Sequence, residues 1–177
     1  QLLEGYGSIS SNNSQGCCDV SSNTYNAGSA ATSGWKYKNT GASSLYQQQA
    51  GQHKWFTAAS GSADATISWA ERMRIDSSGN VGIGRTPTAV ESAYDSIQLG
   101  AGGMYLSGSS NLAAGQIGQN FYADASGNIK YLGNDEAERI TFNNGIITFD
   151  NASANASGAG ATLTFSERMR IDASGNV

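Results

Sequence analysis

Apolar and polar residues alternate over many short stretches of this sequence. From Ile67 to Ile75 the odd positions carry Ile, Trp, Glu, Met and Ile, and the even positions carry Ser, Ala and two Arg. Residues 163–171 show the same alternation. Because successive side chains of a strand point to opposite faces, this pattern predicts strands with one buried face. We find no apolar spacing typical of an amphipathic helix, so the sequence predicts an all-β fold with little or no helix.

A Ser-Gly-Asn sequence follows both of these predicted strands. Residues 71–81 (ERMRIDSSGNV) and 167–177 (ERMRIDASGNV) are identical at ten of eleven positions and lie 96 residues apart. Ser, Gly and Asn favour tight turns, and residues 81–84 (VGIG) then resume the alternation. The motif predicts a strand, a tight turn and a second strand.

The self-similarity extends along the chain. A weaker copy of the turn begins at Asp124, which lies 48 residues from both Asp76 and Asp172. A sequence that repeats at a fixed spacing indicates a repeated structural unit. We therefore expect two tandem β-rich units, a first unit at residues 1–87 and a second at residues 88–177, the second truncated at its C-terminal strand-turn-strand.

Glu71 and Glu167 interrupt the apolar side of their predicted strands. Either a β-bulge at Ala70 and Ser166 redirects these side chains, or the carboxylates are buried and paired with arginine. The adjacent arginines of the same strand point to the other face. We therefore expect the partner to be an arginine of a neighbouring strand or chain.

The composition leaves few residues to build a core. Leu, Ile, Val and Phe together number 28 of 177, whereas Ala, Ser, Gly and Asn make up about half of the chain. The net charge of only −4 argues against simple disorder, which needs a high net charge as well. We therefore expect either a disordered chain or one that folds with partners that complete the core. The sequence contains no apolar run long enough for a membrane span and no basic stripe for nucleic acid.

The sequence contains no persuasive catalytic set. His53 is the only histidine, and no Gly-x-Ser-x-Gly motif accompanies it. Residues 82–85 (GIGR) lack the Lys-Ser/Thr ending of a phosphate loop, and residues 135–138 (DEAE) lack the EF-hand pattern. Cys17 and Cys18 are adjacent, so we expect free thiols, with an interchain disulfide as the alternative. We predict no catalytic residue, no cofactor and no metal site.

Aromatic residues in the first unit are candidates for carbohydrate binding. Rings beside amides and cations can stack on sugars and bond to their hydroxyl groups. The candidate glycan-binding residues are Trp35, Tyr37, Tyr46, His53 and Trp55. The alternative is that these rings form the core of a β unit, because the chain is poor in Leu and Val.

Residues 71–84 (ERMRIDSSGNVGIG), followed shortly by Pro87, resemble the repeat of bacteriophage tail-fibre and related receptor-binding proteins. The resemblance is specific over residues 66–87 and 162–177 and weak elsewhere, and Arg85 departs from the usual Gly-Ile-Gly-Thr-Thr. It implies an elongated homotrimeric fibre segment, β-helix-like or with interleaved strands, in an extracellular part of the virion. In this family such repeats often precede an intramolecular-chaperone domain.

The resemblance implies a structural shaft segment that supports attachment of the phage to its host. The implied partners are further copies of the chain, other virion tail or fibre proteins, and a bacterial surface polysaccharide or outer-membrane receptor. A lectin-like recognition segment, a polysaccharide-cleaving enzyme, and a head fibre or bacterial surface adhesin are the alternatives. The residues expected to pack in the trimer core are Ile67, Trp69, Met73, Ile75, Val81, Ile83, Leu163, Phe165, Met169 and Ile171.

Overall fold

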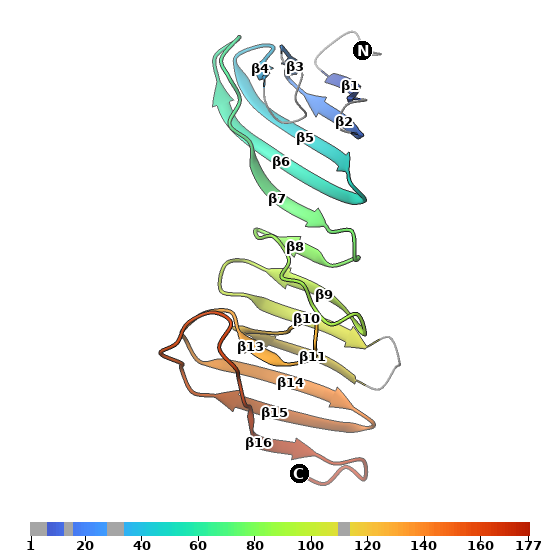
Figure 1. The fold of residues 1–177 in the computed structure, drawn as a ribbon, viewed down its shortest axis with the longest axis vertical. Coiled ribbons are helices and arrows are strands. Elements are labelled where there is room, and N and C mark those ends of the chain that lie inside the picture. Colours follow the sequence, from blue (N-terminus) through green and yellow to red (C-terminus); the bar gives the residue numbers. More distant parts are fainter. Residues whose placement is uncertain (1–6, 13–15, 28–33, 110–113) are drawn as a thin grey trace. The chain divides into compact units, whose positions relative to one another are not determined.

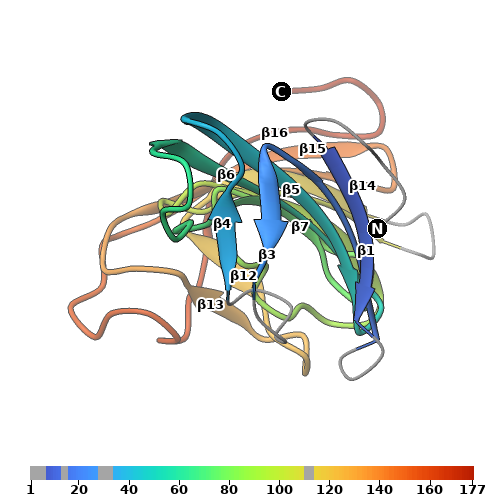
Figure 2. The ribbon, with the colours of Figure 1, turned by 90° about the horizontal axis from the view of Figure 1, so that it is seen from above.

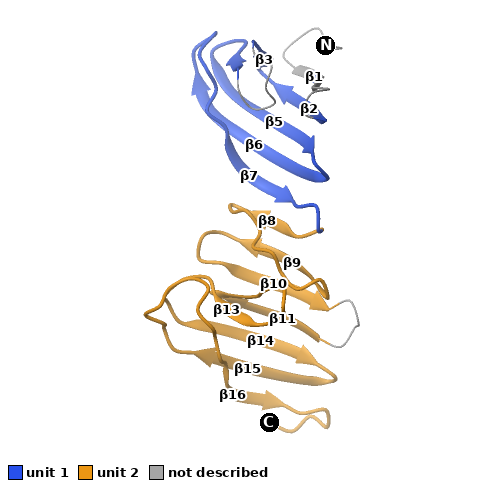
Figure 3. Cartoon of the chain, viewed as in Figure 1, with its two compact units in different colours: residues 1–78 blue, residues 79–177 orange. Residues whose placement is uncertain are grey.

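The computed structural model describes residues 7–12, 16–27, 34–109 and 114–177, which form strands and turns without a helix (Figure 1). The prediction of an all-β chain is confirmed. The chain divides into two compact units, residues 1–78 and 79–177 (Figure 3). This boundary lies inside the first Ser-Gly-Asn turn, before the predicted boundary between residues 87 and 88.

Unit 1 is an antiparallel sheet with a short hairpin on one face. The sheet runs in the order β1 (Gly7–Asn12), β2 (Cys17–Ser22), β5 (Gly41–Gln49), β6 (Gln52–Gly61) and β7 (Ala70–Ile75). The hairpin pairs β3 (Thr24–Asn26) with β4 (Trp35–Tyr37) and lies to one side of β5, β6 and β7 (Figure 2). The core between them consists of Trp35, Tyr37, Leu45, Ala58 and Ile67, with Phe56 and Trp69 packed against it.

Unit 2 has the same plan with two additional strands. Its sheet runs β8 (Val81–Ile83), β9 (Tyr94–Leu99), β10 (Met104–Ser109), β11 (Ala114–Gln119), β14 (Ala137–Asn143), β15 (Ile146–Ala152) and β16 (Ser166–Ile171). Only the β8–β9 pair is parallel among these described strands. The hairpin joins β12 (Phe121–Ala123) to β13 (Ile129–Tyr131). The core residues are Tyr105, Phe121, Tyr131, Ala137, Ala152 and Leu163.

The strands of the two units correspond in order and in pairing. Strands β10, β11, β14, β15 and β16 pair in the same order as β1, β2, β5, β6 and β7. In each unit the hairpin lies in the chain between the second and third of these five strands. The hairpin tyrosines are bonded alike: the hydroxyl of Tyr37 donates to the carbonyl of Ala59, and that of Tyr131 donates to the carbonyl of Ser153, both at 2.6 Å.

An asparagine in the left-handed conformation anchors each hairpin. Asn23 has a φ of 57° and Asn120 a φ of 59°. Nδ2 of Asn120 donates to the carbonyls of Asp135 and Glu136 at 2.7 and 2.9 Å, and its Oδ1 accepts from the amide of Gly133 at 2.7 Å. Asn23 makes three equivalent bonds. Asparagine suits this position because it tolerates positive φ and bonds to nearby backbone groups.

The Ser-Gly-Asn turns have the predicted form. Their glycines have positive φ values of 91°, 79° and 88° at Gly79, Gly127 and Gly175. In the last turn Asp172 accepts a hydrogen bond from the side chain of Asn176, and its carboxylate also accepts from the amides of Asn176 and Ser174. These bonds hold the pKa of Asp172 below its ordinary value, because they favour the ionised carboxylate.

A register shift in the last strand of unit 1 reverses the alternation of its side chains. Trp55 lies opposite Met73, whereas the next residue, Phe56, lies opposite Glu71, so Arg72 is the extra residue of a β-bulge. Every second side chain before the bulge points toward the hairpin. Because of the extra residue, the side chains that continue the same count after the bulge point away from it. Strand β16 has the same shift, with Phe149 opposite Met169, Asp150 opposite Glu167, and Arg168 as the extra residue.

The bulge also decides how the two glutamates are paired. Arg74 Nε donates to Glu71 Oε1 at 2.6 Å, and Arg170 Nη2 donates to Glu167 Oε2 at 2.6 Å. Both partners belong to the same strand as their glutamate, so the expected arginine of a neighbouring strand or chain was wrong. The physical reason is the extra residue, which places residues three apart on the same face. The expected bulge is present, two residues beyond its predicted position at Ala70.

Candidate functional site

Each sheet has a covered face, which carries the hairpin and the core, and an opposite face that we call the open face. In unit 2 the register places large apolar side chains directly opposite one another across the open face, strand after strand. This apolar row consists of Val81, Ile97, Leu106, Ile117, Ile140, Phe149 and Met169. Further apolar side chains flank the row, namely Ile83, Leu99, Met104, Phe142, Ile147 and Ile171.

These side chains are unusually exposed for their type. Met104 is 50 % exposed, Leu106 45 % and Phe142 44 %, and five more on this face are 36–43 % exposed. A fully exposed residue of this size has an accessible surface of about 200 Å², so the eight residues together expose roughly 700 Å² to solvent. Contiguous apolar patches this large on a soluble chain mark interaction surfaces.

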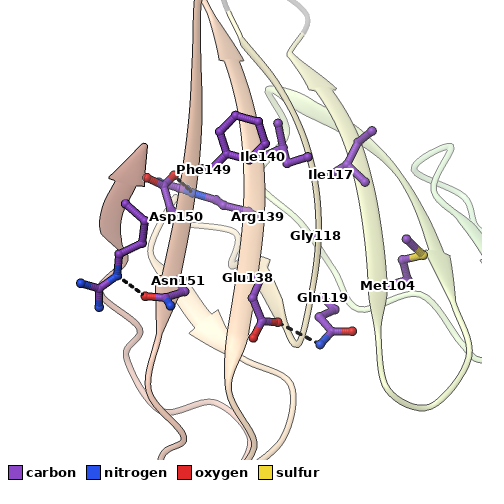
Figure 4. Close-up of a pocket in the computed structure, with 11 residues that line it drawn as sticks. Met104, Ile117, Gly118, Gln119, Glu138, Arg139, Ile140, Phe149, Asp150 and Asn151 are labelled. Atoms are coloured by element: carbon purple, nitrogen blue, oxygen red, sulfur yellow. Dashed lines mark hydrogen bonds and ion pairs between the residues drawn. The ribbon is translucent and has the colours of Figure 1, made fainter. Parts of the chain in front are cut away.

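A shallow pocket of about 420 Å³ lies in the open face of unit 2 (Figure 4). Three residues of the apolar row, Ile117, Ile140 and Phe149, line it from neighbouring strands, and Met104 lies at its β10 side. Aliphatic and aromatic carbon offers no directed hydrogen bonds, so this part of the pocket suits another apolar group.

Polar side chains line one border of the same pocket. Gln119 Nε2 donates to Glu138 Oε2 at 2.9 Å, and Arg168 Nε donates to Asn151 Oδ1 at 2.7 Å (Figure 4). Arg168 is the extra residue of the β16 bulge, and the bulge turns it toward this border. The border therefore presents one carboxylate and one guanidinium beside an uncharged apolar row.

The open face of unit 1 carries the corresponding row with larger and more polar residues. That row consists of Ile9, Val20, Tyr46, Trp55 and Met73. Beside it lie Gln48 and His53, which are exposed. The Tyr46 ring lies 5.1 Å from that of Trp55 and 6.0 Å from that of His53. The Tyr46 hydroxyl is hydrogen-bonded to His53 Nδ1 and accepts a bond from Gln48 Nε2 at 3.1 Å.

The structure separates the five candidate glycan-binding residues into two groups. Tyr46, His53 and Trp55 come together on the open face of unit 1. Trp35 and Tyr37 are 1 % and 5 % exposed and belong to the core beneath the hairpin. A ring buried to that degree cannot stack on a sugar, so only the first group forms a candidate surface.

The residues expected in a trimer core are also divided, and the bulge divides them. Ile67, Trp69, Leu163 and Phe165 pack in the covered-face core of their own unit. The remaining six lie on open faces, namely Met73, Ile75, Val81, Ile83, Met169 and Ile171. Five residues of the apolar row are not among the site residues predicted from the sequence, namely Ile97, Leu106, Ile117, Ile140 and Phe149. Their alternation within strands was visible in the sequence, but the face that stays open was not.

Within the described ranges, no group of three His, Cys, Asp or Glu side chains is placed to hold a metal ion. The same residues include no helix long and apolar enough to cross a membrane. Cys17 and Cys18 form no disulfide in this single chain, and Cys17 is buried.

Comparisons with protein-family models, curated proteins and solved structures find no match to this chain. The open faces and the residues of the repeat are therefore the features that bear on the function of this chain.

Proposed function

We propose that this chain is a structural shaft segment of a phage tail fibre that assembles as a homotrimer. The apolar row of unit 2 is the observation that carries the proposal. A chain with only 28 Leu, Ile, Val and Phe residues leaves many of them on an open face. Association with further copies would remove this surface from water, at about 25 cal/mol per Å² of apolar area.

The correspondence between the two units supports a shaft built of tandem copies. The hairpin tyrosine, the anchoring asparagine and the bulged last strand recur in the same places. Repeated supersecondary units are the usual way to build a long structure whose segments contact only their neighbours. A segment of this kind works mechanically, by holding a distal tip toward the bacterial surface.

The proposed setting is the extracellular part of the virion. Its partners there would be other tail or fibre proteins, and a bacterial polysaccharide or outer-membrane receptor that contacts this segment or a distal one. The repeat sequence at residues 71–84 supports this setting through its resemblance to tail-fibre repeats.

The solution mass of residues 1–177 tests the proposal. We expect light scattering to give three times the 18.3 kDa of one chain, with a β-type circular dichroism spectrum from the same sample. A chain that keeps the β spectrum but stays monomeric throughout the micromolar range would contradict a trimeric shaft.

The aromatic group of unit 1 favours a second candidate function, which is carbohydrate recognition. Tyr46, Trp55 and His53 present adjacent rings with amide and hydroxyl groups beside them, as sugar-binding surfaces do. On a glycan array we expect Trp55→Ala to lower binding about tenfold or more. Tyr25→Ala is the matched control, since Tyr25 is an aromatic residue of the hairpin of unit 1 that lies outside the open face. Equal binding by Trp55→Ala and the unchanged chain would remove this candidate.

A further inference from the structure

We propose that the open face of unit 2 is the surface on which a second copy of this chain packs, with the apolar row buried between the copies. The inference rests on the proposed self-assembly and names the surface responsible for it.

The size of the exposed patch fits this occupant. The eight exposed apolar residues present roughly 700 Å², and each partner of a standard stable interface buries about 800 Å². The partly exposed members of the apolar row, among them Val81, Ile140 and Phe149, add to that area. The patch is therefore large enough for a stable interface without a contribution from the polar border.

The unit's own segments do not occupy this face. The hairpin β12–β13 is committed to the covered face through Phe121 and Tyr131, which are 0 % and 5 % exposed. The segment that leads into β16 packs on the same side through Leu163 and Phe165. Of the other large apolar residues outside the sheet strands in the described part of unit 2, Val90 packs against the same core, Leu132 lies near Gly103, and Val177 is 86 % exposed. None of these segments packs against the apolar row in the structure, which favours a partner from another chain.

The chemistry of the face favours a copy of itself. No member of the apolar row is charged, so the row does not favour a partner of positive or of negative charge. Glu138 and Arg168 on the border have opposite signs, and a second copy brings the opposite charge for each of them. A carbohydrate would leave its hydroxyl groups against Ile117 and Ile140 without hydrogen-bond partners, at a cost of about 1–3 kcal/mol each.

The open face of unit 2 is better suited to self-association than the open face of unit 1. Where unit 2 has Phe142 and Ile147 beside the row, the corresponding register positions of unit 1 carry Gln48 and His53. Amide and imidazole groups are costly to bury without partners. The main apolar drive for assembly therefore comes from unit 2.

The methionines provide a test that needs no substitution. The three methionines of the chain are Met73, Met104 and Met169, and the last two lie on the open face of unit 2 with 50 % and 43 % exposure in the single chain. Peroxide converts exposed methionine to the sulfoxide. In the assembled chain we expect Met104 and Met169 to oxidise at least tenfold more slowly than in the denatured chain, as followed by peptide mass spectrometry.

A charge substitution provides the second test. Leu106 lies in the middle of the apolar row and is 45 % exposed, so lysine fits there in the single chain but must be desolvated between two copies. We expect Leu106→Lys to weaken association at least tenfold by light scattering and to keep the β spectrum. Ala125→Lys, in an exposed turn, is the control and should assemble as the unchanged chain does.

The outcomes separate this inference from the proposed function. If the chain is trimeric, but Met104 oxidises at the denatured rate or Leu106→Lys assembles normally, the copies use another surface and only this inference falls. If Leu106→Lys does not fold, the oxidation of the unchanged chain decides. A monomer with readily oxidised Met104 would overturn both proposals and would leave a different protein as the occupant of the face.

Discussion

Replacing Asp150 by alanine is expected to destabilise the chain by about 3 kcal/mol, because it leaves a partly buried arginine without its carboxylate partner. Asp150 Oδ2 accepts from Arg139 Nε at 2.9 Å, and their side chains are 6 % and 23 % exposed. The guanidinium also lies 4.2 Å from the centre of the Phe165 ring, inside the covered face. Without the carboxylate, the charge of Arg139 keeps its cost of burial and loses its main partner.

Unit 1 contains the replacement that should restore stability. Arg139 and Asp150 are opposite one another in β14 and β15, and the corresponding opposite pair in β5 and β6 is Leu45 and Phe56. A well-packed apolar pair of similar size often replaces a buried ion pair without loss of stability. We therefore expect the double variant Arg139→Leu/Asp150→Phe to recover most of the stability that Asp150→Ala loses.

Urea unfolding followed by circular dichroism would measure these differences, at one fixed protein concentration because assembly adds to apparent stability. The single variant Arg139→Leu is the matched control. It leaves the buried Asp150 without its arginine partner and should therefore also destabilise the chain. An Asp150→Ala variant as stable as the unchanged chain, or a double variant less stable than both single ones, would refute the argument.

The second large effect is expected at Gly118, where alanine should destabilise unit 2 by about 3 kcal/mol or more. A Cβ atom on Gly118 would lie 2.1 Å from the carbonyl oxygen of Glu138, 2.6 Å from the Phe121 ring and 2.8 Å from Cα of Arg139. Two of these atoms belong to the backbone of the paired strand β14, so relief requires the strands to move apart. Gly115→Ala, on the same strand, would meet its nearest atom at 3.5 Å and is expected to change stability by less than about 1 kcal/mol.

The corresponding position of unit 1 explains why glycine is needed only in unit 2. There Ser21 lies on β2 and its hydroxyl bonds to that of Thr24 at 2.6 Å. In unit 2 the place of Thr24 is taken by Phe121, whose ring is fully buried and fills the space above Gly118. A small hairpin residue permits a side chain on the strand, and a large one excludes it. Thermal unfolding of both glycine variants would test this, and equal melting temperatures would contradict it.

Local features of the fold could be predicted from the sequence with good accuracy. The alternation between Ile67 and Ile75 indicates strand, and the Ser-Gly-Asn sequences indicate tight turns, because both depend on neighbouring residues only. The functional surface was less predictable. The sequence pattern does not distinguish Tyr46 from Trp35, because both are aromatic residues of strands. In the structure Trp35 is buried under the hairpin and Tyr46 is not.

The amino-acid sequence is enough to predict that this chain is all-β, where its repeated turns lie, and that it has few large apolar residues. Tertiary structure alone decided which face each apolar side chain occupies. Arg72 and Arg168 become the extra residues of bulges only through pairing with β6 and β15, and that pairing sends Phe165 into the core and Met169 to the open face. A shift of one residue in a strand moves every following side chain to the other face, so register, which is set by distant strands, governs the candidate site.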